Sequence, residues 1–157
     1  MNKKHDDKLA LENLSIIDME RVILSIDCIS GTESPHIKAA LFRDAVISYA
    51  KPFLKNKFSD NSKGLCISTN HVPKNLKSVH KEVLDLRNEL IAHTDMAIQN
   101  PEISRYKDEI GEMRYWVSVT GYRTIHKEYL LKPLQALAEA VQIELINSRG
   151  TMVKNNF

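Results

Sequence analysis

Two side chains that could act on a phosphate ester lie close together on one predicted helix. Arg87 and His93 are six positions apart in the run of residues 86–95. A guanidinium binds phosphate oxygens and stabilises negative charge that develops on them, and an imidazole exchanges a proton near neutral pH. The pair therefore suggests binding or cleavage of a phosphodiester.

The helix that carries this pair is predicted from its apolar residues. These recur at intervals of three and four and are Leu76, Val79, Val83, Leu86 and Leu90. We expect the helix to begin near Pro73, with a cap around Val72, and to end between His93 and Ala97. At about 100° per residue, Arg87 and His93 fall roughly 60° to either side of the apolar stripe. Both residues therefore flank the face that must be buried.

Several neighbours could support a site at this pair. Glu89 lies one turn before His93 and could orient its imidazole or raise its pKa. His80, on the Arg87 side of the helix, could extend a basic substrate cleft together with Lys77, although a partly exposed histidine without such a role fits the pattern too. The spacing of Arg87 and His93 also occurs by chance, and Arg87 could instead close a salt bridge within the chain.

Residues 86–93 resemble the signature of the HEPN superfamily. That signature is an arginine, then a polar residue, then a histidine a few positions on, at the end of a bundle helix. Here these residues are Arg87, Asn88 and His93, and the continuation through Thr94 and Asp95 is similar to HEPN-like proteins linked to phage abortive infection. The resemblance is confined to residues 86–95.

The resemblance implies a bundle of four or five helices that dimerises, so that motifs from two subunits meet at one cleft. It also implies metal-independent RNA cleavage, in which a ribose 2′-OH attacks the adjacent phosphate and leaves a 2′,3′-cyclic phosphate. Arg87 would then stabilise the phosphate, His93 would act as acid or base, and Asn88 would position the motif. A two-fold axis near the apolar stripe would bring Arg87 of one subunit toward His93 of the other.

Three further helices are predicted outside this segment. Residues 8–29 contain neither Gly nor Pro and are apolar around much of the helix, so they need cover from the rest of the chain or from a second subunit. Ser34 and Pro35 form a start signal for a helix over residues 35–51, and residues 59–71 have the composition of a loop. Pro133 begins a last helix over residues 133–148, with Gly150 after its end. These elements predict a mainly α fold, a four- to five-helix bundle, with another helical topology as the alternative.

A stretch of different character interrupts the helical pattern. Residues 113–125 are aromatic and β-branched and contain a glycine, which favours a short β-hairpin or an extended arm. Tyr106, Tyr115, Trp116 and Tyr122 alternate with arginines at 105, 114 and 123. These aromatic residues could stack on bases, or they could belong to the core or to an interface.

The composition fits one globular domain. The chain has 157 residues, of which 43% are hydrophobic and 27% charged, and we expect a single domain over residues 1–150 with a frayed tail over 151–157. The charged N-terminus is unlike a signal peptide, and no apolar run approaches the roughly 20 residues that span a bilayer, so we expect a cytoplasmic protein with no membrane contact. Cys28 and Cys66 fit reduced thiols, with Cys28 in the core.

Charge is unevenly distributed along the chain. Residues 36–81 hold nine Lys and Arg against Asp44 and Asp60 alone. Such a basic region could attract a phosphate backbone, although exposed helices also carry lysines for solubility.

Together these features favour a HEPN-like endoribonuclease of toxin or phage-defence type that acts on RNA as a homodimer, with an antitoxin protein as a further partner. One alternative is a non-catalytic HEPN-like dimer that binds a nucleotide or a protein, and another is an unrelated helical interaction module. The sequence lacks the further Glu and Glu-x-x-His sets that a metal site in a bundle needs, so we expect neither a metal nor a cofactor.

Overall fold

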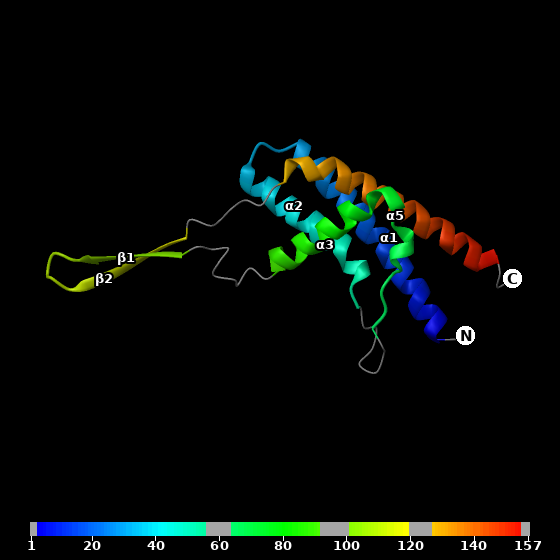
Figure 1. The fold of residues 1–157 in the computed structure, drawn as a ribbon, viewed down its shortest axis with the longest axis horizontal. Helices are drawn as coiled ribbons and strands as arrows, with labels where there is room; N and C mark the ends of the chain where they lie inside the picture. The colour runs from blue at the N-terminus through cyan, green and yellow to red at the C-terminus, as the bar shows by residue number, and fades with distance from the viewer. Residues whose placement is uncertain (1–2, 56–63, 92–100, 120–126, 155–157) are drawn as a thin grey trace.

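The computed structural model describes residues 3–55, 64–91, 101–119 and 127–154. Over these residues, four α-helices pack together and two strands form an antiparallel hairpin (Figure 1). The helices are α1 (Lys3–Ser30), α2 (Pro35–Ala50), α3 (Lys77–Ile91) and α5 (Glu128–Lys154), and the strands are β1 (Pro101–Lys107) and β2 (Met113–Val119). The short 3-10 turns are η1 (Lys51–Phe53), η2 (Thr69–His71) and η3 (Lys74–Leu76). The predicted mainly α bundle with a hairpin is confirmed.

The four helices enclose one apolar interior. α1 lies against α2 and α5, and α3 lies against the same two helices, so that neighbours in this ring run antiparallel (Figure 1). The largest fully buried side chains include Met19, Phe42, Tyr49, Leu86, Leu130, Leu134, Leu137 and Leu145. Because every helix contributes to this interior, burial of apolar side chains is the main force that fixes the position of each helix.

Polar contacts fix the register of α1 relative to α2. Nη2 of Arg21 lies 2.6 Å from Oδ1 of Asp44, and Oγ of Ser25 donates to Oδ2 of the same carboxylate at 2.8 Å. Nζ of Lys51 donates to Oδ1 of Asp18 at 2.8 Å. The two cations are largely exposed, so these pairs add specificity more than stability.

The predicted start of α2 is confirmed, with one difference. Ser34 has an extended backbone and Pro35 occupies the first helical turn, but the Ser34 side chain makes no capping hydrogen bond. α3 begins at Lys77 instead of Pro73, because the 3-10 turn η3 occupies Lys74–Leu76. The predicted loop over residues 59–71 includes the 3-10 turn η2 at its end, and residues 56–63 lie outside the described part of the chain.

The last helix is longer at both ends than predicted. α5 begins at Glu128, so Pro133 lies inside the helix rather than at its start. An interior proline costs about 3 kcal/mol, but Leu130, in the turn before it, is fully buried, and burial of a leucine offsets about 1.5–3 kcal/mol. Gly150 does not end the helix either, since α5 continues to Lys154 and includes four residues of the tail predicted to fray.

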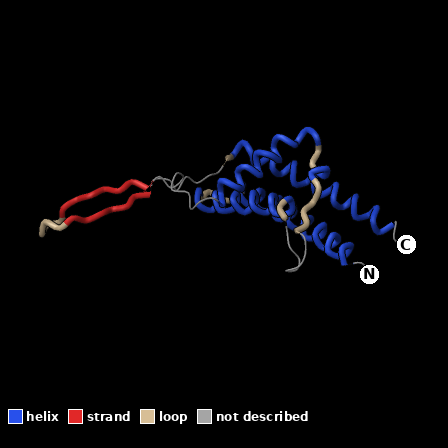
Figure 2. Tube along the Cα trace, turned by 60° about the horizontal axis from the view of Figure 1, so that its bottom comes forward, coloured by secondary structure: helices blue, strands red, loops and turns tan. Residues whose placement is uncertain are grey.

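The hairpin contains more of the chain than predicted. Residues 113–125 contain β2, but its partner β1 covers Pro101–Lys107, and residues 120–126 lie outside the described residues. Gly111 in the turn has a φ of +83°, which favours glycine. The Asp108 carboxylate accepts hydrogen bonds from the Ile110 and Glu112 amides and from Arg114, which closes the turn. Both views show the hairpin standing apart from the bundle (Figures 1 and 2).

Cys28 does not lie in the core as predicted. It is exposed on α1, and Cys66 is exposed as well. The apolar residues of α1 outnumber the positions that the other helices cover, so a small residue near the end of the helix remains at the surface.

Alanine substitutions of two leucines on α3 test which face of this helix points into the bundle. Leu86 is buried and Leu84 is only partly buried. We expect Leu86→Ala to lower the free energy of unfolding by about 2–5 kcal/mol, because it leaves a cavity in a packed interior. Leu84→Ala, the matched control, should cost less than half as much. Urea unfolding followed by circular dichroism measures both values, and equal losses would contradict the orientation of α3.

Candidate functional site

The candidate site is built on α3, whose apolar stripe fixes which side chains face outward. Val83, Leu86 and Leu90 are buried against α2 and α5, the two helices that α3 contacts. Because the same chain covers this stripe, it is not free to face a second subunit. The two-fold axis expected near the stripe therefore stays a prediction, and it would have to pass beside the buried residues, on the side of α3 that carries Arg87.

Arg87 lies on α3 next to the buried apolar stripe and is itself partly buried. Its Nη1 donates to Oδ1 of Asn88 at 3.2 Å, while Asn88 itself is exposed. Among the residues that the structure describes, no carboxylate lies within ion-pair distance of Arg87, so the predicted alternative of an internal salt bridge has no partner there. The guanidinium is thus held beside Asn88, and a guanidinium is a group that can bind an anion.

His93 lies outside the described residues, together with Ala92, Thr94 and Asp95. The last residue of α3 is Ile91. The distance between Arg87 and His93, and the effect of Glu89 on the imidazole, therefore stay predictions.

The other predicted substrate-binding residues on α3 are at its surface, except for His80. Lys77 is exposed at the first position of the helix and Glu89 is exposed near its end. Lys74 and Lys81 are exposed as well, and their spacing of three and four residues from Lys77 places them on one side of the chain. The turn η3 and the first half of α3 therefore present a row of three cations to solvent.

His80 does not open onto a cleft, because its ring is only 8% exposed. Nδ1 of His80 lies 2.7 Å from the Tyr49 hydroxyl, and the Phe53 ring packs edge-on at a centroid distance of 4.6 Å. Burial lowers the pKa of His80 and raises that of Tyr49. A neutral His80 that accepts a hydrogen bond from the Tyr49 hydroxyl at Nδ1 carries its own proton at Nε2. In this arrangement His80 joins α3 to α2 and η1 instead of extending a basic cleft.

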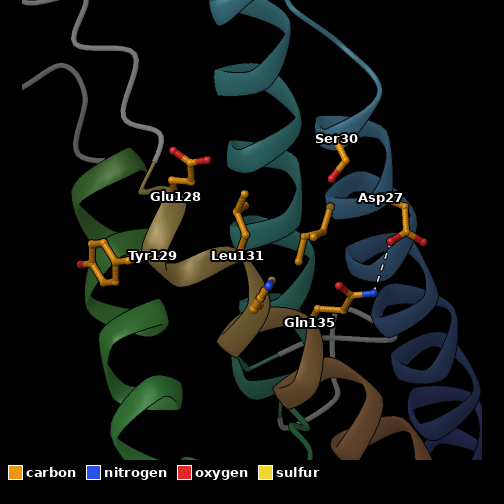
Figure 3. Close-up of a pocket in the computed structure, with 8 residues that line it drawn as sticks. Asp27, Ser30, Glu128, Tyr129, Leu131 and Gln135 are labelled. Carbon is orange, nitrogen blue, oxygen red and sulfur yellow. Dashed lines mark hydrogen bonds between the residues drawn. The ribbon is translucent and has the colours of Figure 1, made fainter.

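A pocket of about 340 Å³ lies elsewhere, between the end of α1 and the start of α5. Asp27, Ser30 and Gln135 line it with Glu128 (Figure 3), and Nε2 of Gln135 donates to Asp27 at 3.3 Å. The Tyr129 side chain points away from Asp27 and Gln135 (Figure 3). Its hydroxyl donates a hydrogen bond to Glu82 of α3. None of the predicted site residues that the structure describes lines this pocket. Sequence reasoning missed it because its two sides come from distant segments without a shared motif.

An apolar surface remains on the outer side of the bundle. On α1, Leu14, Ile17, Leu24 and Cys28 are exposed, and we call them the outer α1 face. Their spacing is that of a helix–helix seam with Arg21 at the remaining position. Ile143 and Ile146 are exposed on α5, which is joined to α1 by Gln142 and Glu20 at 3.3 Å. The sequence left open whether the rest of the chain or a second subunit covers the first helix, and the described residues leave these side chains exposed.

Comparison of this chain with protein-family models, with curated proteins and with solved structures finds no match. The fold therefore defines the class only as a mainly helical bundle with a two-stranded hairpin. Within the described segments, no three His, Cys, Asp or Glu side chains are grouped as metal ligands would be. None of the helices described is both long and apolar enough to cross a membrane.

The buried His80 predicts a pH dependence of stability. Because burial lowers its pKa below the ordinary 6.5, the unfolded chain binds a proton more readily than the folded chain does. The contribution of His80 is therefore complete above about pH 6.5 and is lost as the pH falls toward the lowered value. Between about pH 7.5 and about pH 5.5, we expect the unfolding free energy to fall more in wild type than in His80→Gln, which keeps an acceptor for Tyr49.

The control is His36→Gln, since His36 is exposed at the start of α2. This variant should keep the wild-type slope of unfolding free energy against pH. Equal slopes for wild type and His80→Gln would mean that folding does not lower the pKa of His80.

Proposed function

We propose that this chain is a metal-independent endoribonuclease of the HEPN type, which acts as a homodimer in a toxin or phage-defence role. The observation that carries the proposal is the Arg87 guanidinium. It is partly buried beside the apolar stripe of α3, hydrogen-bonded to Asn88, and without a carboxylate partner among the described residues. A cation so placed is suited to an anionic ligand, because removing a charge from water is costly without one.

The proposed chemistry uses the residues that the sequence singled out, Arg87, Asn88, Glu89 and His93. His93, in its neutral form, removes the proton of a ribose 2′-OH, whose oxygen attacks the adjacent phosphorus. The bond from phosphorus to the 5′-oxygen breaks, and a protonated imidazole returns a proton to that oxygen. Arg87 stabilises the charge on the phosphoryl oxygens, Asn88 holds the guanidinium, and Glu89 orients His93. The products are a 2′,3′-cyclic phosphate and a 5′-OH, and the step needs no metal.

The row of exposed lysines supports RNA as the substrate. Lys77 and Arg87 are ten residues apart, which corresponds to about 15 Å along a helix, a length that several phosphates of a single strand can follow. Lys74 and Lys81 add to the positive charge at the start of α3, whereas Asp85 and Glu89 are exposed nearer its end. We infer that the first half of the helix binds backbone phosphates and that the scissile phosphate lies near Arg87.

The second copy would meet α3 at the side that carries Arg87. Leu84 on this side is partly buried, so a modest apolar contact remains available beside the guanidinium. A two-fold axis there brings two Arg87 side chains and two ends of α3 together. For a nuclease of toxin type, a separate antitoxin protein would restrain the activity.

A second candidate is a non-catalytic dimeric module, and the outer α1 face favours it. Ile17 and Leu24 are 58% and 63% exposed, which is unusual for apolar residues at helix-seam spacing. α1 contacts α2 and α5 and lies across the bundle from α3. A dimer formed there keeps the two Arg87 residues apart, so in this case Arg87 and His93 have no joint catalytic role.

Removal of the imidazole tests the nuclease directly. We expect His93→Ala to lower the rate of RNA cleavage by about 10²–10⁴-fold, because proton transfer is lost. His36→Ala, at an exposed histidine of α2, serves as the matched control and should cleave at the wild-type rate. Gel analysis of product ends must reveal a 2′,3′-cyclic phosphate.

Absence of cleavage by the wild-type chain on any RNA tested would favour the non-catalytic module. Arg87→Ala gives an independent check. If this variant unfolds while the wild type has no activity to lose, Arg87 serves only the fold.

The second candidate is tested at the outer α1 face. If the chain dimerises there, Leu24→Glu should convert the dimer to a monomer, because each copy would bury a carboxylate against apolar side chains. Ile37→Glu is the control, since Ile37 is similarly exposed but lies on α2. Analytical ultracentrifugation gives the oligomeric state, and a dimer that persists in Leu24→Glu excludes this face as its interface.

A further inference from the structure

The hairpin has two faces of different chemistry. On one face lie Ile103, Arg105, Lys107, Met113 and Tyr115, which we call the Arg105 face. Ser104, Tyr106 and Arg114 belong to the other face, because side chains alternate along a strand. All of these side chains are exposed, so none of them packs on the bundle as a core residue would.

Positive charge on the Arg105 face is not neutralised by its neighbours. Arg105 and Lys107 have no ion-pair partner among the described residues, and the named residues of this face include no carboxylate. The acidic groups of the turn are engaged elsewhere, since Asp108 and Glu112 lie 2.8 Å and 3.3 Å from the Arg114 guanidinium. Glu109, exposed in the turn, is the nearest other carboxylate in sequence. The strand surface is therefore cationic although the turn is acidic.

An aromatic ring accompanies these cations. Tyr115 lies opposite Arg105 in the register, and the guanidinium carbon stands 5.8 Å from the centre of its ring. The Tyr115 side chain is 65% exposed, so its ring remains open to a planar ligand. Bases of single-stranded RNA stack on tyrosine and on guanidinium planes alike, and they do so with little regard to sequence.

We infer that the Arg105 face of the hairpin binds single-stranded RNA, with one base stacked on Tyr115 beside Arg105 and a backbone phosphate bound by Lys107. This inference rests on the proposed action on RNA and adds a second contact surface to α3. A hairpin of two strands is marginally stable alone, and a nucleic acid seated on one face would stabilise it. Exposed aromatic and cationic groups on one face complement a strand that offers both bases and phosphates.

The test is binding of a fluorescent single-stranded oligoribonucleotide to the full chain. Methylation of every ribose 2′-oxygen prevents cleavage, so that equilibrium anisotropy can be measured with the wild-type protein. We expect Tyr115→Ala to weaken binding about 5- to 150-fold, the loss typical of one stacked base. Lys107→Gln should weaken binding less and should lower the slope of log affinity against log salt by about 0.7, as for one phosphate on a single strand.

Two variants separate stacking from folding of the hairpin. Tyr106→Ala removes an equally accessible tyrosine from the other face and should bind RNA within twofold of wild type. Tyr115→Phe keeps the ring and should restore the affinity that Tyr115→Ala loses. If Tyr106→Ala binds as weakly as Tyr115→Ala, or if neither Tyr115→Ala nor Lys107→Gln binds more weakly than wild type, the inference is overturned.

The same measurements distinguish this inference from the proposed nuclease. If unmodified RNA is cleaved and the hairpin variants bind RNA as wild type does, the nuclease is supported and RNA binding by the Arg105 face is contradicted. If RNA binding depends on Tyr115 but no RNA is cleaved, the Arg105 face is supported and the nuclease is contradicted. A change in oligomeric state in Tyr115→Ala, with no change in RNA affinity, would assign the face to a second copy of the chain and contradict RNA binding.

Discussion

The position of Arg87 depends on the burial of the α3 stripe between α2 and α5. Val83, Leu86 and Leu90 together contribute several kcal/mol of apolar burial at about 1.5–3 kcal/mol each, far more than one surface hydrogen bond. Rotation of α3 about its axis would expose this stripe, so the angle of every other side chain on the helix is fixed. The contact between Arg87 and Asn88 adjusts where the guanidinium points but does not decide its side.

Burial of the α3 stripe also explains why His80 and Arg87, which lie on one side of α3, have different surroundings. His80 lies where η1 and the end of α2 approach, and Tyr49 and Phe53 enclose its ring. Arg87, two turns later, remains only partly buried. A neutral imidazole can satisfy one hydrogen bond in a dry interior, whereas a guanidinium needs solvent or an anion. The bundle thus uses the histidine for packing and leaves the arginine partly exposed.

The bundle and the hairpin have different physical characters. The bundle is held by a continuous apolar interior, and ion pairs such as Arg21 with Asp44 add register at its surface. In the hairpin the side chains whose burial is described are almost all exposed, and cross-strand pairing and the turn around Asp108 hold its two strands together. Apolar and aromatic side chains exposed without a core to join are typical of interaction surfaces. In the proposed function the bundle fixes the reactive groups and the hairpin adds contacts to the substrate.

The sequence by itself determined the helices that have a regular apolar period. The spacing of Leu76 to Leu90 placed α3, and Pro35 placed the start of α2, because both signals are local. It also placed Arg87 beside the stripe correctly. The tertiary structure decided the rest, for reasons that lie between segments. Burial of Leu130 carries α5 through Pro133, Tyr49 from another helix encloses His80, and the limited cover of α1 leaves Cys28 exposed. Residues distant in the chain decide where α5 begins, whether His80 is buried and whether Cys28 is exposed. A local sequence pattern contains no information about which distant residues will contact it.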